Sequence, residues 1–147
     1  EREDRINSGL SYALRLDLDK AKKMTGKLFW YDRKKGMQMA RPEIFGDFIV
    51  ARKEFSASYH LAATTDDHIQ GISLVTRGDD LFEATHIHRL LQAILGLNTP
   101  CYEHHRLLVG PTGERFAKRH KANTLVDYRE KGLTANDIHK MVGLRPN

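Results

Sequence analysis

Cysteine is almost absent from this chain of 147 residues, which contains only Cys101. A single cysteine excludes an intrachain disulfide and a zinc site built from several cysteines, and it favours a reducing cytoplasm as the compartment.

No apolar run approaches the roughly 18 residues that a transmembrane helix needs. We expect no signal peptide in these residues, because the first five are all charged. The first residue is Glu1 rather than methionine, so we expect a piece of a longer polypeptide.

Positive charge is only mildly in excess. The chain has 24 Lys and Arg against 19 Asp and Glu, which gives a net charge of +5. Such an excess is compatible with a nucleic-acid partner but does not require one. Residues 20–35 form a basic stretch that includes Phe29, Trp30 and Tyr31. This stretch could contact RNA by charge and stacking, although a solvated surface over a small aromatic core is the favoured interpretation.

Hydrophobic periodicity predicts several strands and one clear helix. The predicted strands span residues 10–16, 48–51, 72–76 and 102–109. An apolar stripe at helical spacing is made by Ile87, Leu90, Leu91, Ile94 and Leu95. Strand, polar loop and helix therefore follow one another over residues 72–95. This order is typical of nucleotide-binding α/β folds, in which ligands bind at the carboxyl ends of the strands.

The ends of the helices carry recognisable capping residues. We expect Asp80 to cap the first turn of the striped helix together with Glu83, and Gly96 to end it. Two further short helices are predicted over residues 124–131 and 134–143, because each segment starts at a threonine and is bounded by a glycine.

Arg77 is the most informative single residue at this point. It directly follows a predicted strand and precedes a polar loop and the striped helix. A guanidinium in that position could reach into the crevice at the strand end and bind a carboxylate through two N–H groups. An ion pair with Asp79 or Asp80 is an equally compatible interpretation, since such pairs are common in loops.

The eight histidines do not predict a metal site. His86 and His88 are two residues apart in the predicted helix and point in different directions. His104 and His105 are adjacent in a predicted strand and face opposite sides. No pair has the spacing of a zinc motif. Cys101 lacks the surroundings of a catalytic nucleophile, so we expect it to be an ordinary thiol.

A second candidate is the basic cluster formed by Arg115, Lys118, Arg119 and Lys121, which follows a glycine-rich turn. A charge run alone would favour a solvated face. After a glycine-rich turn, however, a lysine-bearing loop could close over phosphates and neutralise the charge that develops during nucleotidyl transfer.

Several segments together resemble a known family. They are residues 46–52 (GDFIVAR), 58–62 (SYHLA), 66–72 (DDHIQGI), 77–81 (RGDDL) and 91–97 (LQAILGL). These segments look like the second half of the catalytic domain of glutamyl-tRNA synthetases, which are class I aminoacyl-tRNA synthetases. Residues 113–119 fall where class I synthetases carry their Lys-Met-Ser-Lys-Ser loop. Within the family, the chain is most similar to the short bacterial glutamyl-queuosine tRNA(Asp) synthetases, mainly in residues 128–144.

The resemblance implies a fold and a division of the chain. The fold is α/β: the second half of a class I Rossmann-like nucleotide-binding catalytic domain, with terminal helices. Residues 1–45 would belong to the region inserted between the two Rossmann halves. Residues 46–120 would form the second half with its signature-like loop, and residues 121–147 would form the C-terminal helices.

The resemblance also implies an activity. Such enzymes use ATP with Mg²⁺ to convert L-glutamate to glutamyl-adenylate, and then glutamylate the queuosine base of tRNA(Asp). The family's first half carries an ATP-binding signature and, in many members, a zinc-binding cluster. Neither is found in this sequence, so we expect these 147 residues alone to be inactive. Two alternatives remain: part of an ordinary glutamyl-tRNA synthetase that charges tRNA(Glu), and a non-catalytic RNA-binding module.

Four residues acquire expected roles from the resemblance. Tyr59 and Arg77 match family positions that bind glutamate, and a phenol with a planar cation suits a carboxylate. Lys118 matches the second lysine of the signature loop and would contact the ATP phosphates. Asp80 lies near the nucleotide-binding positions of the family.

The signature-like loop departs from the family pattern around Lys118. Arg115 replaces the first lysine, Phe116 the methionine or leucine, and Ala117 the serine. Arg119 occupies the last position. Positive charge is therefore kept at the start of the loop, whereas the serine hydroxyl is lost.

Overall fold

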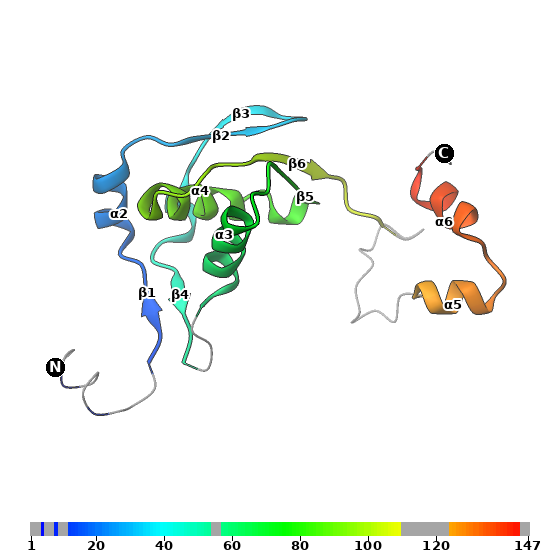
Figure 1. Ribbon diagram of the computed structural model, residues 1–147, viewed down its shortest axis with the longest axis horizontal. Helices are drawn as coiled ribbons and strands as arrows, with labels where there is room; N and C mark the ends of the chain where they lie inside the picture. Colours follow the sequence, from blue (N-terminus) through cyan, green and yellow to red (C-terminus); the bar gives the residue numbers. More distant parts are fainter. Residues whose placement is uncertain (1–3, 5–7, 9–11, 54–56, 110–123, 145–147) are drawn as a thin grey trace. The chain divides into compact units, whose positions relative to one another are not determined.

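The computed structural model describes residues 4, 8, 12–53, 57–109 and 124–144 (Figure 1). The chain divides into two compact units, Glu1–His105 and Arg106–Asn147. The larger unit contains both sheets and three of the helices within the described residues.

The main sheet has four strands in the order β3–β2–β6–β5. Strands β2 (Phe29–Asp32) and β3 (Gly36–Met39) form an antiparallel hairpin. Strand β6 (Cys101–His105) runs parallel both to β2 and to β5 (Leu74–Gly78). The carboxyl ends of β2, β5 and β6 therefore lie at the same edge of the sheet, the position where α/β folds place ligands.

A second, two-stranded sheet pairs β1 (Leu14–Arg15) with β4 (Ile49–Ala51) in antiparallel orientation. Strands were predicted near these positions and near β5 and β6. The observed β5 begins and ends two residues later than the predicted segment, so that Arg77 lies within the strand rather than after it.

Helix α4 (Ala84–Leu95) provides the centre of the hydrophobic core. Its predicted apolar stripe is confirmed for Ile87, Leu90 and Leu91, which are buried, and Ile94 packs against them, whereas Leu95 is exposed. The core cluster consists of Leu18, Ala21, Phe48, Ile87, Leu90 and Leu91. The first two of these belong to α2 (Leu18–Thr25), which packs against α4 as does α3 (Tyr59–Ile69). Figure 1 shows these helices next to the sheet.

The two ends of α4 differ in how well they were predicted. Gly96 ends the helix in the left-handed conformation, with φ 66° and ψ 28°, as expected. The expected capping box from Asp80 to Glu83 is wrong. Residues Asp79–Leu81 form a short 3-10 helix that leads into α4, and Glu83 itself is the N-cap, with helical backbone angles and no capping side chain.

The smaller unit contains α5 (Leu125–Glu130) and α6 (Ala135–Val142), which confirms both predicted terminal helices. Each begins with a reciprocal capping box, from Thr124 to Asp127 and from Thr134 to Asp137. No helix within the described part of the chain is long and apolar enough to cross a membrane.

Truncating the core side chain Leu90 should lower the free energy of unfolding of the chain by about 2–5 kcal/mol, because Leu90 is fully buried and Leu90→Ala leaves a cavity. Leu95→Ala in the same helix is the matched control. Leu95 is 48% exposed, so its truncation should change the free energy by about 0.5 kcal/mol. Urea unfolding followed by circular dichroism measures both, and equal losses would contradict the assignment of the core.

Candidate functional site

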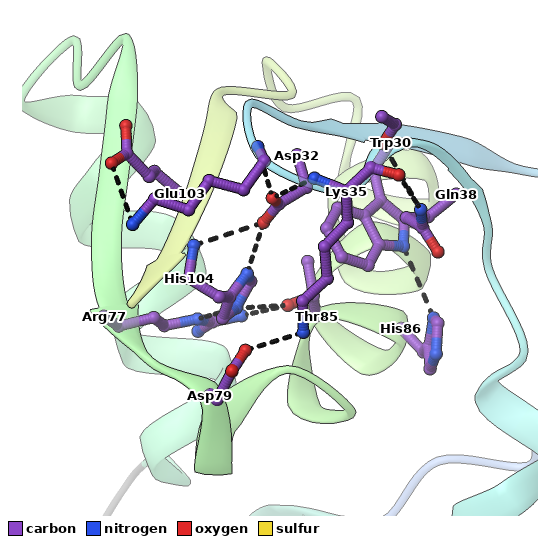
Figure 2. Close-up of polar contacts among 12 residues, drawn as sticks. Trp30, Asp32, Lys35, Gln38, Arg77, Asp79, Thr85, His86, Glu103 and His104 are labelled. Carbon is purple, nitrogen blue, oxygen red and sulfur yellow. Dashed lines mark hydrogen bonds and ion pairs between the residues drawn. The ribbon is translucent and has the colours of Figure 1, made fainter. Parts of the chain in front are cut away.

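Arg77 is buried at the carboxyl-end region of β5, with only 8% of its surface exposed. Each of its three guanidinium nitrogens has a partner. Nε donates to Nε2 of His104 at 3.1 Å, Nη1 donates to Nδ1 of His88 at 3.2 Å, and Nη2 donates to the hydroxyl of Thr85. Figure 2 shows Arg77 directed at His104 and Thr85. Because arginine has five N–H groups, two remain after these three bonds.

His104 is held in turn by Asp32, which lies at the end of β2 and is fully buried. One carboxylate oxygen, Oδ2, accepts from the ring Nδ1 of His104 at 2.6 Å and from its backbone N–H at 3.2 Å. The other oxygen accepts the backbone N–H groups of Lys34 and Lys35 in the hairpin turn. Asp32 therefore fixes the hairpin to β6 and orients the imidazole (Figure 2).

Burial by itself would raise the pKa of Asp32. The hydrogen bonds from the His104 ring and from the backbone N–H groups of Lys34, Lys35 and His104 oppose it, and the net result is a pKa below the ordinary value. Asp32 is therefore an anion at neutral pH, and its carboxylate is stabilised by four N–H donors.

Arg77 determines which nitrogen of each imidazole carries the proton. Arginine has no acceptor, so a ring nitrogen that faces it must be unprotonated. His104 therefore carries its proton on Nδ1, where it can donate to Asp32. His88 carries its proton on Nε2, which lies 3.1 Å from Nδ1 of His60 and can donate to it. Two chains of hydrogen bonds therefore start at Arg77. In one, Arg77 donates to His104 and His104 donates to Asp32; in the other, Arg77 donates to His88 and His88 donates to His60.

The pKa shifts agree with neutral imidazoles. Burial, together with the charge of Arg77 and the neighbouring His60, lowers the pKa of His88 to about 3. Burial likewise lowers the pKa of His104, although its hydrogen bond to Asp32 acts in the opposite direction. The pKa of His60 is lowered by burial and by Arg77. Arg77 is consequently surrounded by neutral acceptors at neutral pH.

Tyr59 is the first residue of α3 and is 54% exposed. Its ring centroid lies 5.4 Å from that of His60 and 6.0 Å from that of His88. His88 therefore contacts Arg77 on one side and lies near Tyr59 on the other. The fold thus brings together the two residues that were predicted to bind glutamate, 18 positions apart, through one imidazole; their role stays a prediction.

A second buried group, centred on Trp30 of β2, packs next to His104. The indole N–H of Trp30 donates to Nδ1 of His86 at 3.3 Å. The Trp30 ring packs against Phe82 with ring centroids 5.1 Å apart. Lys35 lies over that Phe82 ring at 4.0 Å and pairs with Asp79 at 2.6 Å. Asp79, which was considered as an ion-pair partner for Arg77, is therefore engaged by Lys35 instead.

The remaining predicted site residues are less informative. Asp80 is exposed in the 3-10 helix that follows β5, and its nucleotide-binding role stays a prediction. Lys118 and the other loop residues Arg115, Phe116, Ala117 and Arg119 lie outside the described residues. Cys101 is an exposed free thiol. Among the described residues, no group of histidine, cysteine and carboxylate side chains could hold a metal ion.

Four residues of the site were missed by sequence reasoning: Asp32, Thr85, His88 and His104. The histidines were considered only as metal ligands, and their spacing argued against that use. The available signal was that His86 and His88 occur on a predicted core helix, where a buried imidazole needs a polar partner. Nothing in the sequence indicated that the partner would be Arg77.

A sequence profile of the family described as "tRNA synthetases class I (E and Q), catalytic domain" matches residues 1–145. The chain belongs to this family. The resemblance inferred from the sequence segments is thereby confirmed.

Two curated relatives illustrate the range of similarity. The glutamyl-Q tRNA(Asp) synthetase of Rhodobacter capsulatus is 45% identical over 136 residues, which cover 90% of this chain and 49% of that protein. The glutamate–tRNA ligase 2 of Syntrophus aciditrophicus is 34% identical over 108 residues, covering 74% of this chain and 22% of that protein. The chain therefore spans half or less of the length of these relatives.

The fold class is confirmed by a solved structure. The glutamate-tRNA synthetase from Elizabethkingia anophelis matches with a TM-score of 0.64 at 22% identity, over 90% of this chain and 25% of that chain. The α/β unit is thus part of a class I Rossmann-like fold. The predicted division at residues 45 and 120 stays a prediction; residues 29–39 contribute β2 and β3 to the same sheet as β5 and β6.

The lowered histidine pKa values predict that acid destabilises this chain. Between about pH 6.5 and pH 3 the unfolded chain binds a proton at His88 that the folded chain excludes. The free energy of unfolding should therefore fall as the pH falls, by about 1 kcal/mol per pH unit from His88 alone. His60, His86 and His104 add to the same trend, since their pKa values are also lowered.

Urea unfolding between pH 8 and pH 4 measures this slope. His88→Asn, whose side-chain oxygen can accept from Arg77, should have a shallower slope than the unchanged chain. Leu95→Ala, at an exposed position of the same helix and without a titratable group, is the control and should leave the slope intact. An equal slope in the His88 variant would contradict the assignment of a neutral, buried imidazole.

Proposed function

We propose that the gene product containing this chain activates L-glutamate with ATP to glutamyl-adenylate and transfers the glutamyl group to the queuosine base of tRNA(Asp). The observation that carries the proposal is Arg77: a buried cation that keeps two N–H donors after bonding to neutral acceptors. One of those acceptors, His88, also lies next to the exposed ring of Tyr59. The choice of acceptor is supported by the similarity to the Rhodobacter capsulatus glutamyl-Q tRNA(Asp) synthetase.

The proposed chemistry has two steps. A carboxylate oxygen of glutamate attacks the α-phosphorus of ATP, which enters as its magnesium complex, and pyrophosphate leaves. A hydroxyl of queuosine then attacks the acyl carbon of the adenylate, and AMP leaves. The protein's contribution is to position the reactants and to supply positive charge, without a covalent enzyme intermediate.

Each site residue has a proposed part in the first step. Arg77 and Tyr59 hold the side-chain carboxylate of glutamate, so that its α-carboxylate is the one left to react. Lys118, within the loop of residues 115–119, steadies the ATP phosphates, and Asp80 lies close to the nucleotide. With Ala117 in place of a serine, the phosphate contacts of this loop come from Lys118 and from its arginines.

The same arrangement favours glutamate over glutamine. The two remaining N–H groups of Arg77 are donors and require acceptors. Both oxygens of a carboxylate accept, whereas the amide of glutamine would place its own N–H₂ against one of them. The three hydrogen-bond partners of Arg77 carry no negative charge, so none of them competes with the ligand carboxylate for the guanidinium. A site of this kind discriminates strongly, because the wrong substrate leaves a buried donor unpaired.

A glutamyl-tRNA synthetase that charges tRNA(Glu) is the second candidate. The specific observation in its favour is the 34% identity to the Syntrophus aciditrophicus glutamate–tRNA ligase 2. Both candidates share the adenylation step and differ only in the tRNA that accepts glutamate.

The acceptor can be identified by charging assays on the complete gene product. Radioactive glutamate should be transferred to tRNA(Asp) that contains queuosine, and not to tRNA(Asp) transcribed without the modification, which is the matched control. Transfer to tRNA(Glu) alone would replace the proposal by the second candidate. Absence of any glutamate-dependent exchange between ATP and pyrophosphate would instead favour a non-catalytic RNA-binding module.

Arg77→Lys tests the carboxylate contact directly. Lysine keeps the charge but loses the planar fork, so the KM for glutamate in ATP–pyrophosphate exchange should rise by roughly 10- to 100-fold, as expected for a lost charged hydrogen bond. The KM for ATP should stay within about threefold of the original value. Arg33→Lys, at an exposed arginine of the hairpin turn, is the control. An unchanged KM for glutamate in the Arg77 variant would argue against the assignment.

A further inference from the structure

We propose that Asp32 and His104 are positioning residues for glutamate recognition: they hold the Arg77 guanidinium in the orientation that presents its two remaining N–H groups to the carboxylate. This inference rests on the proposed function, because it assigns to Arg77 the role of carboxylate binder. It adds two residues that contact Arg77 or its partner rather than the substrate.

The first step of the argument is that the guanidinium is held at three corners. Its partners His104, Thr85 and His88 come from β6 and α4 and contact three different nitrogens. A planar group bound at three corners can neither rotate in its plane nor tilt out of it without breaking a bond. All three partners are nearly completely buried, so water does not replace them at low cost.

The second step concerns the orientation of His104. A single oxygen of Asp32 accepts both from the ring Nδ1 and from the backbone N–H of the same residue. The imidazole is thereby fixed relative to its own backbone, and Nε2 is directed at Arg77 3.1 Å away. The second oxygen of Asp32 is engaged by Lys34 and Lys35, so the carboxylate cannot turn away.

The third step explains why an imidazole separates the acid from the arginine. A carboxylate in direct contact would occupy two N–H groups of Arg77 and neutralise its charge. The neutral imidazole uses one N–H group and leaves the charge in place. Asp32 thus orients Arg77 through His104 without taking over the donors that the substrate needs.

Two substitutions at His104 separate positioning from mere structural support. In His104→Gln the side-chain oxygen can take the place of Nε2 and accept from Arg77, while the donor to Asp32 is lost. In His104→Asn the side-chain N–H₂ can take the place of Nδ1 and donate to Asp32, while the acceptor for Arg77 is lost. Each variant therefore removes one of the two hydrogen bonds of the ring and keeps the other.

The measurement is the KM for glutamate in ATP–pyrophosphate exchange by the complete gene product, with the KM for ATP as an internal control. Positioning predicts a rise of roughly tenfold or more in the KM for glutamate with His104→Asn, since Arg77 loses a partner worth about one hydrogen bond. His104→Gln keeps the acceptor but loses the bond to Asp32 that orients it, so the KM for glutamate should rise by a smaller factor, roughly threefold. If neither variant raises the KM for glutamate, or if both raise the KM for ATP by the same factor, the inference is overturned; an unchanged KM for glutamate in His104→Gln overturns the part assigned to Asp32.

Glutamate-dependent ATP–pyrophosphate exchange is measured first with the unaltered protein. If it shows no glutamate-dependent exchange, the proposed function itself fails, and the positioning role fails with it. If it is active and neither variant raises the KM for glutamate, only the inference fails.

A second measurement does not depend on the folding of any variant. Nitrogen-15 chemical shifts of the histidine rings in the unaltered chain should show a protonated Nδ1 in His104 and a protonated Nε2 in His88. The opposite tautomers, or a doubly protonated His104 at pH 7, would overturn the arrangement on which the inference depends.

Discussion

The structure of the site depends on one constraint: a buried arginine needs hydrogen-bond acceptors. Because its guanidinium only donates, each atom that faces it must carry a free lone pair. Because Arg77 is nearly enclosed, each of its nitrogens must find a partner or lose its hydration without compensation. The partners that the fold provides are two imidazoles and a hydroxyl. This choice keeps the positive charge of Arg77 available, and it forces His88 and His104 to remain neutral with defined tautomers.

The same constraint explains why distant elements converge. Asp32 accepts from the hairpin turn and from His104 of β6, and β6 pairs with β5, which carries Arg77. Helix α4 contributes Thr85 and His88, which bond to Arg77. The rings of Trp30 and Tyr102 pack against each other and are buried next to this network. The same buried residues therefore pack the domain and orient Arg77. Arg77 lies near the carboxyl ends of the parallel strands, where α/β folds bind their ligands.

Sequence patterns predicted those elements whose information is local. Most of the stripe on α4 and the threonine-capped helices α5 and α6 were confirmed, since periodicity and capping are properties of neighbouring residues. Helices α2 and α3 and the β2–β3 hairpin were not predicted. Helix α2 buries only Leu18 and Ala21, and α3 buries only Thr64 completely, so neither presents a clear apolar period. The hairpin turn is stabilised by Asp32, whose importance comes from partners elsewhere.

By itself, the sequence determined the family, the α/β class and the candidates Tyr59 and Arg77, because these are carried by short segments of consecutive residues. Only the tertiary structure decided that Asp32 and His104, 72 residues apart, share a hydrogen bond and that the pair reaches Arg77. The physical reason is that a hydrogen bond between buried side chains depends on strand order and register. The parallel pairing of β6 with both β2 and β5 depends on packing between distant segments, and no run of neighbouring residues predicts it.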